Sequence, residues 1–343
     1  MTIVSVVLAT YNGARFIRQQ LDSIRRQSRP PDEVVIIDDC STDGTPAAVE
    51  EFIRSHRQVG WHLTRSAENV GYRRNFYRGV RASRGDVVFL CDQDDIWNRD
   101  KVKLMTEVMA ATPGVLSLNS AVRLIDERGN PLRRRSPFGV GTAKATSKAL
   151  RSGVAIERIE AGRLMVRNVG PGAAQCFDGT TRERFLESYD CGMPHDWYLN
   201  LLAAVREGCW YLDEPLVNYR VHGANAIGAR SSWRRAFDTR ARESLAAECR
   251  ERLLSFSTIP ELVERSHNRM LGPAWSYTRR RQGFYADPSV RSWLELTRRP
   301  EYRAATSPRA RLWDAIIASG ADTFLERIAA PRPEVEPRRT EKP

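Results

Sequence analysis

Three aspartates follow one apolar segment of the sequence. Asp92, Asp94 and Asp95 come directly after the apolar run Val87–Leu90. Ionised carboxylates this close together repel one another and resist burial, so the cluster needs a compensating charge. Mg²⁺ or Mn²⁺ would supply it, because these ions take carboxylate oxygens together with the phosphates of a ligand. The alternative is that Asp94 or Asp95 caps a helix near Lys101, which accounts for one aspartate but not for three.

A second acidic cluster occupies residues 36–45, IIDDCSTDGT. An ionised carboxylate only accepts hydrogen bonds, so Asp39 is suited to a nucleobase or a ribose. Asp43 is expected to act as a local cap or turn residue. The alternative for the whole stretch is an acidic turn that begins a helix.

Two further polar stretches have a functional and a structural interpretation. In residues 68–76, ENVGYRRNF, Arg73 or Arg74 would face a diphosphate, or both belong to a solvated basic surface. In residues 193–201, MPHDWYLNL, Asp196 would be the N-cap of a helix, with His195 on the surface. The first stretch favours neither interpretation, whereas the second by itself favours the structural one.

Residues 218–228, NYRVHGANAIG, place Arg220, His222 and Asn225 around a glycine turn. A single histidine is more often structural than functional, so this stretch alone favours a structural role.

The elements that must position these groups alternate along the first hundred residues. Apolar and β-branched runs predict strands, and helical spacing of apolar residues predicts helices between them. The strands are expected at 3–9, 34–37, 61–64 and 87–90, and the helices at 14–26, 46–56 and 75–84. This βαβαβαβ order predicts a parallel sheet with right-handed crossovers. The polar clusters follow strand ends, where ligands bind in open parallel sheets.

The pattern continues less regularly up to residue 221. Helices are expected at 101–111, 182–188 and 196–207, and strands at 116–125, 172–177 and 209–212, with 215–221 closing this region. Residues 133–153 are basic, rich in Gly, Ser and Thr and without periodicity, which predicts a mobile loop. Beyond about residue 230 the chain is Arg-rich and helical.

Composition narrows the class of protein. The 343 residues carry a net charge of +12, which indicates a polyanionic partner such as a phosphorylated ligand, an anionic membrane or nucleic acid. The six cysteines form no CxxC pair, which indicates reduced thiols, with Cys91 and Cys176 in the core. The sequence shows no signal peptide and no run of about 18 apolar residues, so we expect a cytoplasmic protein, peripheral at most to the inner face of the membrane.

Four motifs resemble the family 2 glycosyltransferases of the GT-A fold. They are Ala9-Thr10-Tyr11-Asn12, Asp38-Asp39-Cys40-Ser41-Thr42-Asp43-Gly44-Thr45, Asn69-Val70-Gly71 and Asp92-Gln93-Asp94-Asp95. More narrowly, CDQDDIW with HDW and YRVHGAN looks like bacterial rhamnosyltransferases that extend surface polysaccharides. The resemblance covers residues 2–228 and implies a mostly parallel α/β sheet flanked by helices. It divides the chain into a catalytic domain at 1–228, a basic helical region at 229–330 and a disordered tail at 331–343.

The resemblance also implies a role for each matched position. Thr10, Tyr11 and Asp39 would contact the nucleotide, Asp92 and Asp94 would hold Mg²⁺ or Mn²⁺, Asp196 would be the catalytic base, and Arg73, Arg220 and His222 would approach the diphosphate. The family usually has Glu-Asp at the base position, where this chain has His195-Asp196. Trp97 is expected in the core and Trp197 at the acceptor site.

The function implied is an inverting, metal-dependent transfer of a sugar, with L-rhamnose from dTDP-β-L-rhamnose favoured, to a saccharide or a lipid-linked saccharide. The alternatives are a UDP- or GDP-sugar donor and, more remotely, a non-catalytic protein that binds nucleotides or nucleic acid. Against nucleic acid, the chain has no zinc finger, RNP-type motif or basic zipper, and its acidic clusters would repel a polyanion.

The basic region leaves two interpretations open. Its arginines between 234 and 252, beside Trp233 and Phe237, would meet anionic lipid, or they form a solvated face that packs on the catalytic domain or makes a homodimer.

Overall fold

The computed structural model describes residues 2–133, 148–149, 155–223, 239–265, 271–306 and 308–320, with the backbone alone at 148–149, 239–242 and 309. Most of the loop expected at 133–153, Trp233, Phe237 and the tail expected at 331–343 lie outside these residues. The chain forms two compact units, one of residues 1–230 with 250–278 and the other of 231–249 with 279–343. The first unit therefore includes residues that the sequence assigned to the C-terminal region.

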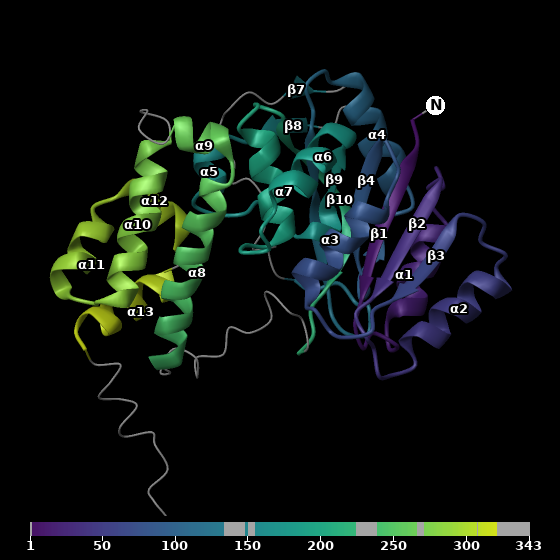
Figure 1. Cartoon of the computed structure of the whole chain (residues 1–343), viewed down its shortest axis with the longest axis horizontal. Helices are drawn as coiled ribbons and strands as arrows, with labels where there is room; N and C mark the ends of the chain where they lie inside the picture. Colours follow the sequence, from purple (N-terminus) through teal and green to yellow (C-terminus); the bar gives the residue numbers. More distant parts are fainter. Residues whose placement is uncertain are drawn as a thin grey trace, which may run out of the picture. The chain divides into compact units, whose positions relative to one another are not determined.

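One mixed sheet forms the centre of the first unit (Figure 1). Its strands within the described residues are β1 (Val4–Thr10), β2 (Glu33–Asp38), β3 (Trp61–Arg65), β4 (Val87–Asp92), β5 (Ile96–Trp97), β6 (Ser117–Ile125), β7 (Lys148–Ala149), β8 (Ala155–Arg158), β9 (Gln175–Asp178) and β10 (Cys209–Arg220). Their order is β3-β2-β1-β4-β9-β6-β10-β8-β7, with β5 paired to β10.

The first four strands are parallel, as the sequence predicted. In the register, Thr10 lies opposite Asp38, and Ala9 lies opposite Asp92. The polar residues that end β1, β2 and β4 therefore meet at one edge of the sheet. This confirms that the clusters after these strands converge.

The second half of the sheet is mixed. Strand β9 is antiparallel to both β4 and β6, and β10 runs parallel to β6. Sequence reasoning divided β10 at Asp213 and Glu214, but it is one strand with a shift of register around Pro215. The short β5 pairs with β10 at Asn218, which brings the end of β10 to the acidic turn after β4.

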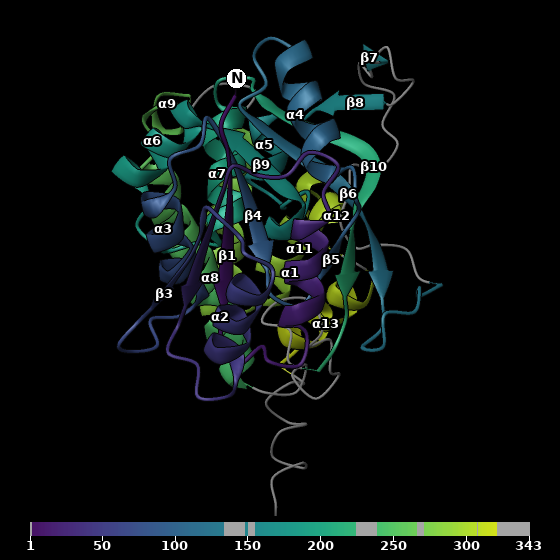
Figure 2. The same cartoon turned by 90° about the vertical axis from the view of Figure 1, so that its right-hand side faces the viewer.

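Helices cover both faces of the sheet. The helices up to residue 220 are α1 (Ile17–Arg25), α2 (Thr45–Ser55), α3 (Tyr72–Ala82), α4 (Lys101–Ala111), α5 (Ala161–Leu164), α6 (Gly179–Ser188) and α7 (His195–Ala204), with the 3-10 turn η1 (Gly172–Ala174). Figures 1 and 2 show α1 and α3 on opposite sides of β1. Both faces of β1 are therefore buried, which explains its continuous apolar run.

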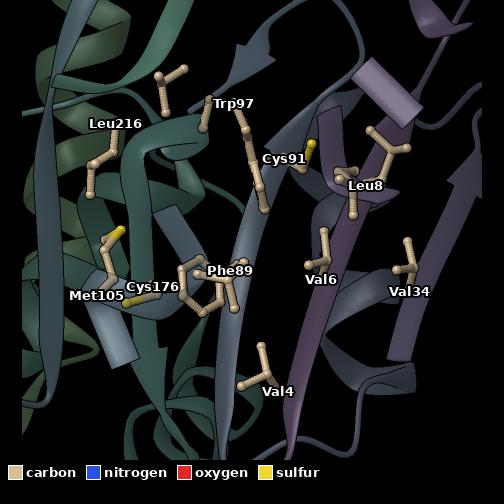
Figure 3. Close-up of a cluster of buried hydrophobic side chains, with 14 of the residues drawn as sticks. Val4, Val6, Leu8, Val34, Phe89, Cys91, Trp97, Met105, Cys176 and Leu216 are labelled. Carbon is tan, nitrogen blue, oxygen red and sulfur yellow. The ribbon is translucent and has the colours of Figure 1, made fainter. Parts of the chain in front are cut away.

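Alternate residues of the parallel strands face opposite helical layers. Val4, Val6 and Leu8 point into one apolar layer with Phe89 and Cys91 (Figure 3). On the other face α3 lies unusually close to the sheet. A Cβ at Gly79 would lie 2.4 Å from Val7 Cγ1, so a glycine is required there.

The rest of the described chain is helical. It contains α8 (Thr239–Ser257), α9 (Pro260–Glu264), α10 (Gly272–Ala286), α11 (Val290–Thr297), α12 (Pro300–Ala305) and α13 (Pro308–Ala318). In the second unit, buried Asp314 accepts hydrogen bonds from the hydroxyl groups of Tyr285 and Tyr302, each at 2.9 Å. Among the described helices, none has the length and apolar character to cross a bilayer.

Candidate active site

The loop after β1 is held by the loop after β2. The Thr10 hydroxyl donates to Asp38 Oδ1 at 2.8 Å, and the backbone N–H of Asn12 donates to Ser41 Oγ at 2.9 Å. Asn12 has φ +47°, a conformation that asparagine tolerates better than most residues. Thr10 is thus buried, and its hydroxyl group helps to hold the loop in place. Its contact with the nucleotide stays a prediction.

Asp39 shapes the next loop of the edge. Only 2% exposed, it accepts the backbone N–H groups of Val70 at 2.9 Å and Gly71 at 2.8 Å, and its carbonyl accepts the Asn69 side-chain amide. These bonds explain why the Asn69-Val70-Gly71 motif accompanies an aspartate thirty residues earlier. Contact of Asp39 with a nucleobase stays a prediction.

Gln93, which sequence reasoning did not single out, joins the β1 loop to the acidic loop. Its amide accepts the Tyr11 N–H and donates to the Tyr11 carbonyl, both at 2.8 Å. A Cβ at Gly13 would lie 2.1 Å from Gln93 Oε1, so this approach depends on a glycine. The Tyr11 side chain is left 47% exposed at the surface of the site, where the predicted nucleotide contact needs it.

The acidic turn after β4 has a separate partner for each of two aspartates. His222 Nε2 lies 2.8 Å from Asp94 Oδ2, and the Arg220 N–H donates to Asp95 Oδ1 at 2.8 Å. Burial raises the pKa of Asp92 to about 7, with further contributions from Asp94 and Asp196. Burial and the neighbouring carboxylates also raise the pKa of Asp95 well above its usual value.

The helix-capping interpretation of this cluster is wrong. Helix α4 begins after Asp100 with no side-chain capping bond; the Asp95 carboxylate bonds instead to Arg220 at the end of β10, and the Asp94 carboxylate to His222, two residues beyond β10. The first residue of α4, Lys101, is buried in the core, where its ammonium donates to the Ala173 carbonyl at 2.5 Å. Burial lowers the pKa of Lys101 to about 8.

The carboxylate oxygens of the acidic turn are the type of ligand that a divalent cation such as Mg²⁺ prefers. Asp92 and Asp94 are partly exposed hard oxygen donors, and the pKa of Asp92 is raised first by burial and then by the charges of Asp94 and Asp196. Within the described part of the chain, no three His, Cys, Asp or Glu side chains are grouped to hold a metal ion. A cation here would therefore need ligand phosphates as further donors, as Mg²⁺ commonly does.

Arg220 holds the acidic turn after β4 in place through its side chain and its backbone N–H. It is fully buried, and its guanidinium donates to the carbonyls of Asp94 at 2.7 Å and Glu127 at 2.9 Å and to the Gln19 side chain at 2.7 Å. Its guanidinium also lies 4.7 Å above the Phe16 ring. Contrary to the prediction of a diphosphate contact, Arg220 in this structure binds protein acceptors, because it lies beneath the loop rather than at its surface.

The predicted base lies across the same edge of the sheet. Asp196, in the first turn of α7, is 8% exposed, and Asn168 Nδ2 donates to its Oδ2 at 2.9 Å. Burial raises its pKa to about 6, and hydrogen bonds from the Trp197 N–H and from Asn168 oppose the rise. Because the charge of Asp196 raises the pKa of Asp92, the two carboxylates share one electrostatic environment.

One interpretation of the sequence placed His195 on the surface, but this residue is buried. Its ring is 4% exposed and stacks on Phe76, with centroids 3.9 Å apart. Burial and the nearby Arg73 charge lower its pKa to about 3. A neutral ring thus stands where the family's glutamate would add a second negative charge beside Asp196.

Arg73 holds the segment that leads to the base. Its Nη1 donates to the carbonyls of Gly192 at 2.8 Å and Cys191 at 3.2 Å, and its side chain is 30% exposed. Its contact with a diphosphate stays a prediction. The hydroxyl group of Ser255, on α8, donates to the Asp190 carboxylate at 2.9 Å, so α8 helps to hold the same segment.

The two tryptophans beside the acidic motifs differ. Trp97 is 3% exposed, which confirms its place in the core. Trp197 is partly exposed, and the Arg252 guanidinium lies 4.4 Å above its ring. Of the arginines expected to meet lipid, Arg252 is therefore engaged with the catalytic unit. The acceptor role of Trp197 stays a prediction.

The fold defines a class of protein, the GT-A glycosyltransferase fold, in which polar residues that follow β1, β2 and β4 meet at one edge of a central sheet. Residues 5–168 match the family described as glycosyl transferase family 2. All six cysteines are free, with Cys91 and Cys176 buried as predicted.

Among curated proteins, the chain is similar to the dTDP-rhamnosyl transferase RfbG of Shigella flexneri. The two are 27% identical over 239 residues, which cover 66% of this chain and 75% of RfbG. Further relatives are matched over 62% and 50% of their own lengths.

Two solved structures share the fold. One is S. aureus TarS 1–349 in complex with UDP-GlcNAc, with a TM-score of 0.56 and 16% identity over 95% of this chain and 92% of that one. The other is the mannosyltransferase PcManGT of Pyrobaculum calidifontis in complex with GDP-Man and Mn²⁺, with a TM-score of 0.50 and 18% identity over 95% and 87%.

Proposed function

We propose that the protein is an inverting, metal-dependent glycosyltransferase that moves a sugar from a nucleoside diphosphate donor to a saccharide or lipid-linked saccharide in surface polysaccharide synthesis. The observation that carries the proposal is the pairing of Asp92 and Asp196 across one edge of the sheet, with the pKa of each carboxyl raised by burial. Such a pair supplies an ion-binding carboxylate on one side and a poised base on the other.

The reaction divides between these two sides. The acceptor hydroxyl attacks the anomeric carbon from the face opposite the leaving nucleoside diphosphate, through an oxocarbenium-like transition state. As the new C–O bond forms and the old one breaks, the hydroxyl proton passes to the Asp196 carboxylate. Asp94 and Asp92 would hold Mg²⁺ or Mn²⁺, which when bound offsets the charge that develops on the diphosphate. A β-linked donor then gives an α-linked product.

We favour dTDP-β-L-rhamnose as the donor. The support is the name of RfbG and the HDW and YRVHGAN motifs. UDP- and GDP-sugars are the alternative, supported by the ligands named for TarS and PcManGT. The bound metal named for PcManGT supports the choice of Mn²⁺ in the assay.

Thermal unfolding with each nucleotide sugar tests the donor. A ligand at about 100 times its Kd stabilises the folded state by about 2.7 kcal/mol, so the true donor should raise Tm in the presence of Mn²⁺. Asp94→Ala should lose this metal-dependent rise, and the exposed Asp287→Ala should keep it. If Asp94→Ala binds the donor as the wild type does, the metal assignment is wrong.

Release of the nucleoside diphosphate tests the base. Asp196→Asn should retain the donor-induced rise in Tm but lose about 10²–10⁴-fold in turnover, the range for removal of a general base. Turnover at the wild-type rate would overturn the assignment of Asp196.

We also propose peripheral contact with anionic membrane at the cytoplasmic face. Helix α11 exposes Val290 and Leu294 one turn apart, beside the exposed Arg291, whose Nε lies 3.6 Å from Glu295 Oε1 on the same helix. Apolar and cationic groups on one helix suit a lipid surface. Vesicles with phosphatidylglycerol should retain the full-length protein at low salt, and Leu294→Asp should weaken binding. Equal binding to neutral vesicles would refute the electrostatic part, and a dimer in solution would favour the alternative use of this surface.

A further inference from the structure

A chain of buried amides leads from the sheet to the proposed base. Asn119 on β6, Gln175 on β9 and Asn200 on α7 are each 0% exposed, and Asn168 joins them to Asp196. Buried amides are costly unless they form hydrogen bonds, and amides that bond to one another restrict the arrangement of the interior. In the described structure the Gln175 side-chain nitrogen is bonded, whereas its Oε1 has no hydrogen-bond partner. This network ends on a carboxylate that the chemistry uses.

The orientation of the Asn168 amide is decided by its neighbours. Its Nδ2 donates to the Gly170 carbonyl and to Asp196 Oδ2, both at 2.9 Å. Its Oδ1 accepts the N–H of Val169 at 2.9 Å. A flipped amide would place its oxygen against a carbonyl and a carboxylate, so the N–H must face Asp196.

Asn200 fixes the far side of Asn168. The Asn200 side-chain oxygen accepts from the Ser117 hydroxyl at 2.9 Å, Asn119 Nδ2 at 2.7 Å and Gln175 Nε2 at 2.9 Å, and from the Cys209 thiol at 3.5 Å. The Asn200 amide nitrogen donates to Asn119 Oδ1 at 3.1 Å and to Asn168 Oδ1 at 3.3 Å.

The backbone around the base is held by the same network. Gln175 Nε2 donates to the Asp196 carbonyl at 3.2 Å. The network thus contacts both the main chain and the side chain of Asp196, and the strands β6 and β9 set its position relative to the sheet edge.

We infer that Asn168, oriented by Asn200, is a positioning residue that aims the Asp196 carboxylate and favours its ionised form. The inference rests on the proposed function, because it assigns a purpose to Asn168 only if Asp196 removes a proton. A donor aimed at a carboxylate stabilises the charge that burial disfavours. A base in this position must be ionised at working pH, and Asn168 provides that without a cation.

The test is the pH dependence of dTDP release from dTDP-L-rhamnose, with Mn²⁺ and with water as the acceptor. In Asn168→Ala the loss of one charge-assisted hydrogen bond should move the acid limb of kcat/KM up by about one pH unit. Donor-induced stabilisation should be unchanged. Asn168→Asp, which keeps the shape but adds a like charge, should move the limb further in the same direction.

Asn119→Ala is the matched control. It removes another amide of the network, which bonds to Asn200 and, in the described structure, forms no hydrogen bond to the Asp196 carboxylate, and it should reduce Tm without moving the acid limb. If Asn168→Ala and Asn168→Asp keep the wild-type limb, or if Asn119→Ala moves it equally, the inference is overturned. Wild-type turnover by Asp196→Asn would instead overturn the proposed function, so the two failures are distinguishable.

Discussion

Removing the charge of Asp196 should stabilise the protein while it abolishes transfer. Burial raises the pKa of Asp196 from 3.8 to about 6. A carboxyl whose folded-state pKa is raised binds its proton more tightly when folded, so its contribution to stability falls as pH rises from the unfolded value toward the folded one. Above that window the ionised group destabilises the fold by a constant amount, and Asp196→Asn should recover it.

The size of the gain follows from the two pKa values. A difference of about two units corresponds to about 3 kcal/mol, at 1.36 kcal/mol per unit. The whole of this should appear at pH 8, where both states are ionised. At pH 5 the folded state is still mostly protonated and only the unfolded state is ionised, so roughly half of the gain should remain.

Denaturant unfolding at pH 5 and pH 8 measures this difference, without donor or metal. Asp287→Asn, at an exposed aspartate, is the control and should change stability by less than about 0.5 kcal/mol at either pH. If Asp196→Asn is no more stable than wild type at pH 8, burial does not penalise the ionised Asp196 side chain. The raised pKa is then not explained by burial, and the argument that this carboxylate is poised as a base fails.

Three further predictions follow from single contacts. Wild-type turnover should rise about tenfold from pH 5 to pH 7, because the ionised fraction of Asp196, with its pKa of about 6, rises from about one-eleventh to ten-elevenths; a flat profile would contradict this. Gly13→Ala should displace Gln93, lose its two bonds to Tyr11 and weaken donor binding in calorimetry about tenfold. Gly79→Ala should destabilise the fold by about 1–3 kcal/mol in denaturant unfolding through overpacking against the sheet, and an unchanged midpoint would mean that α3 shifts freely.

The regular part of the fold could be predicted because its signals are local. The apolar run of β1 and the helical spacing of α1 follow from period and composition, and both elements lie within a few residues of their expected bounds. Elements without such signals were missed. Strand β5 has two residues, and β8 alternates too briefly to be recognised, so only pairing with β10 makes them strands.

The candidate site divides in the same way. Asp92, Asp94 and Asp196 could be found because carboxylates at a strand end or a helix start are conspicuous in one dimension. Asn168 could not, because its role depends on an amide orientation that Asp196 and Asn200, 28 and 32 positions away, help to set. The sequence NVGPG at 168–172 predicts only a turn.

Arg220 shows the limit most clearly. The family resemblance implied that Arg220 approaches the diphosphate, but its side chain is fully buried and donates to the main chain of the loop after β4. Residue type and spacing along the chain establish which charges end each strand and that they meet at one edge of the sheet. Folding alone establishes which of those charges face the ligand and which support the loops, since burial and partners arise from contacts between segments that are far apart in the chain.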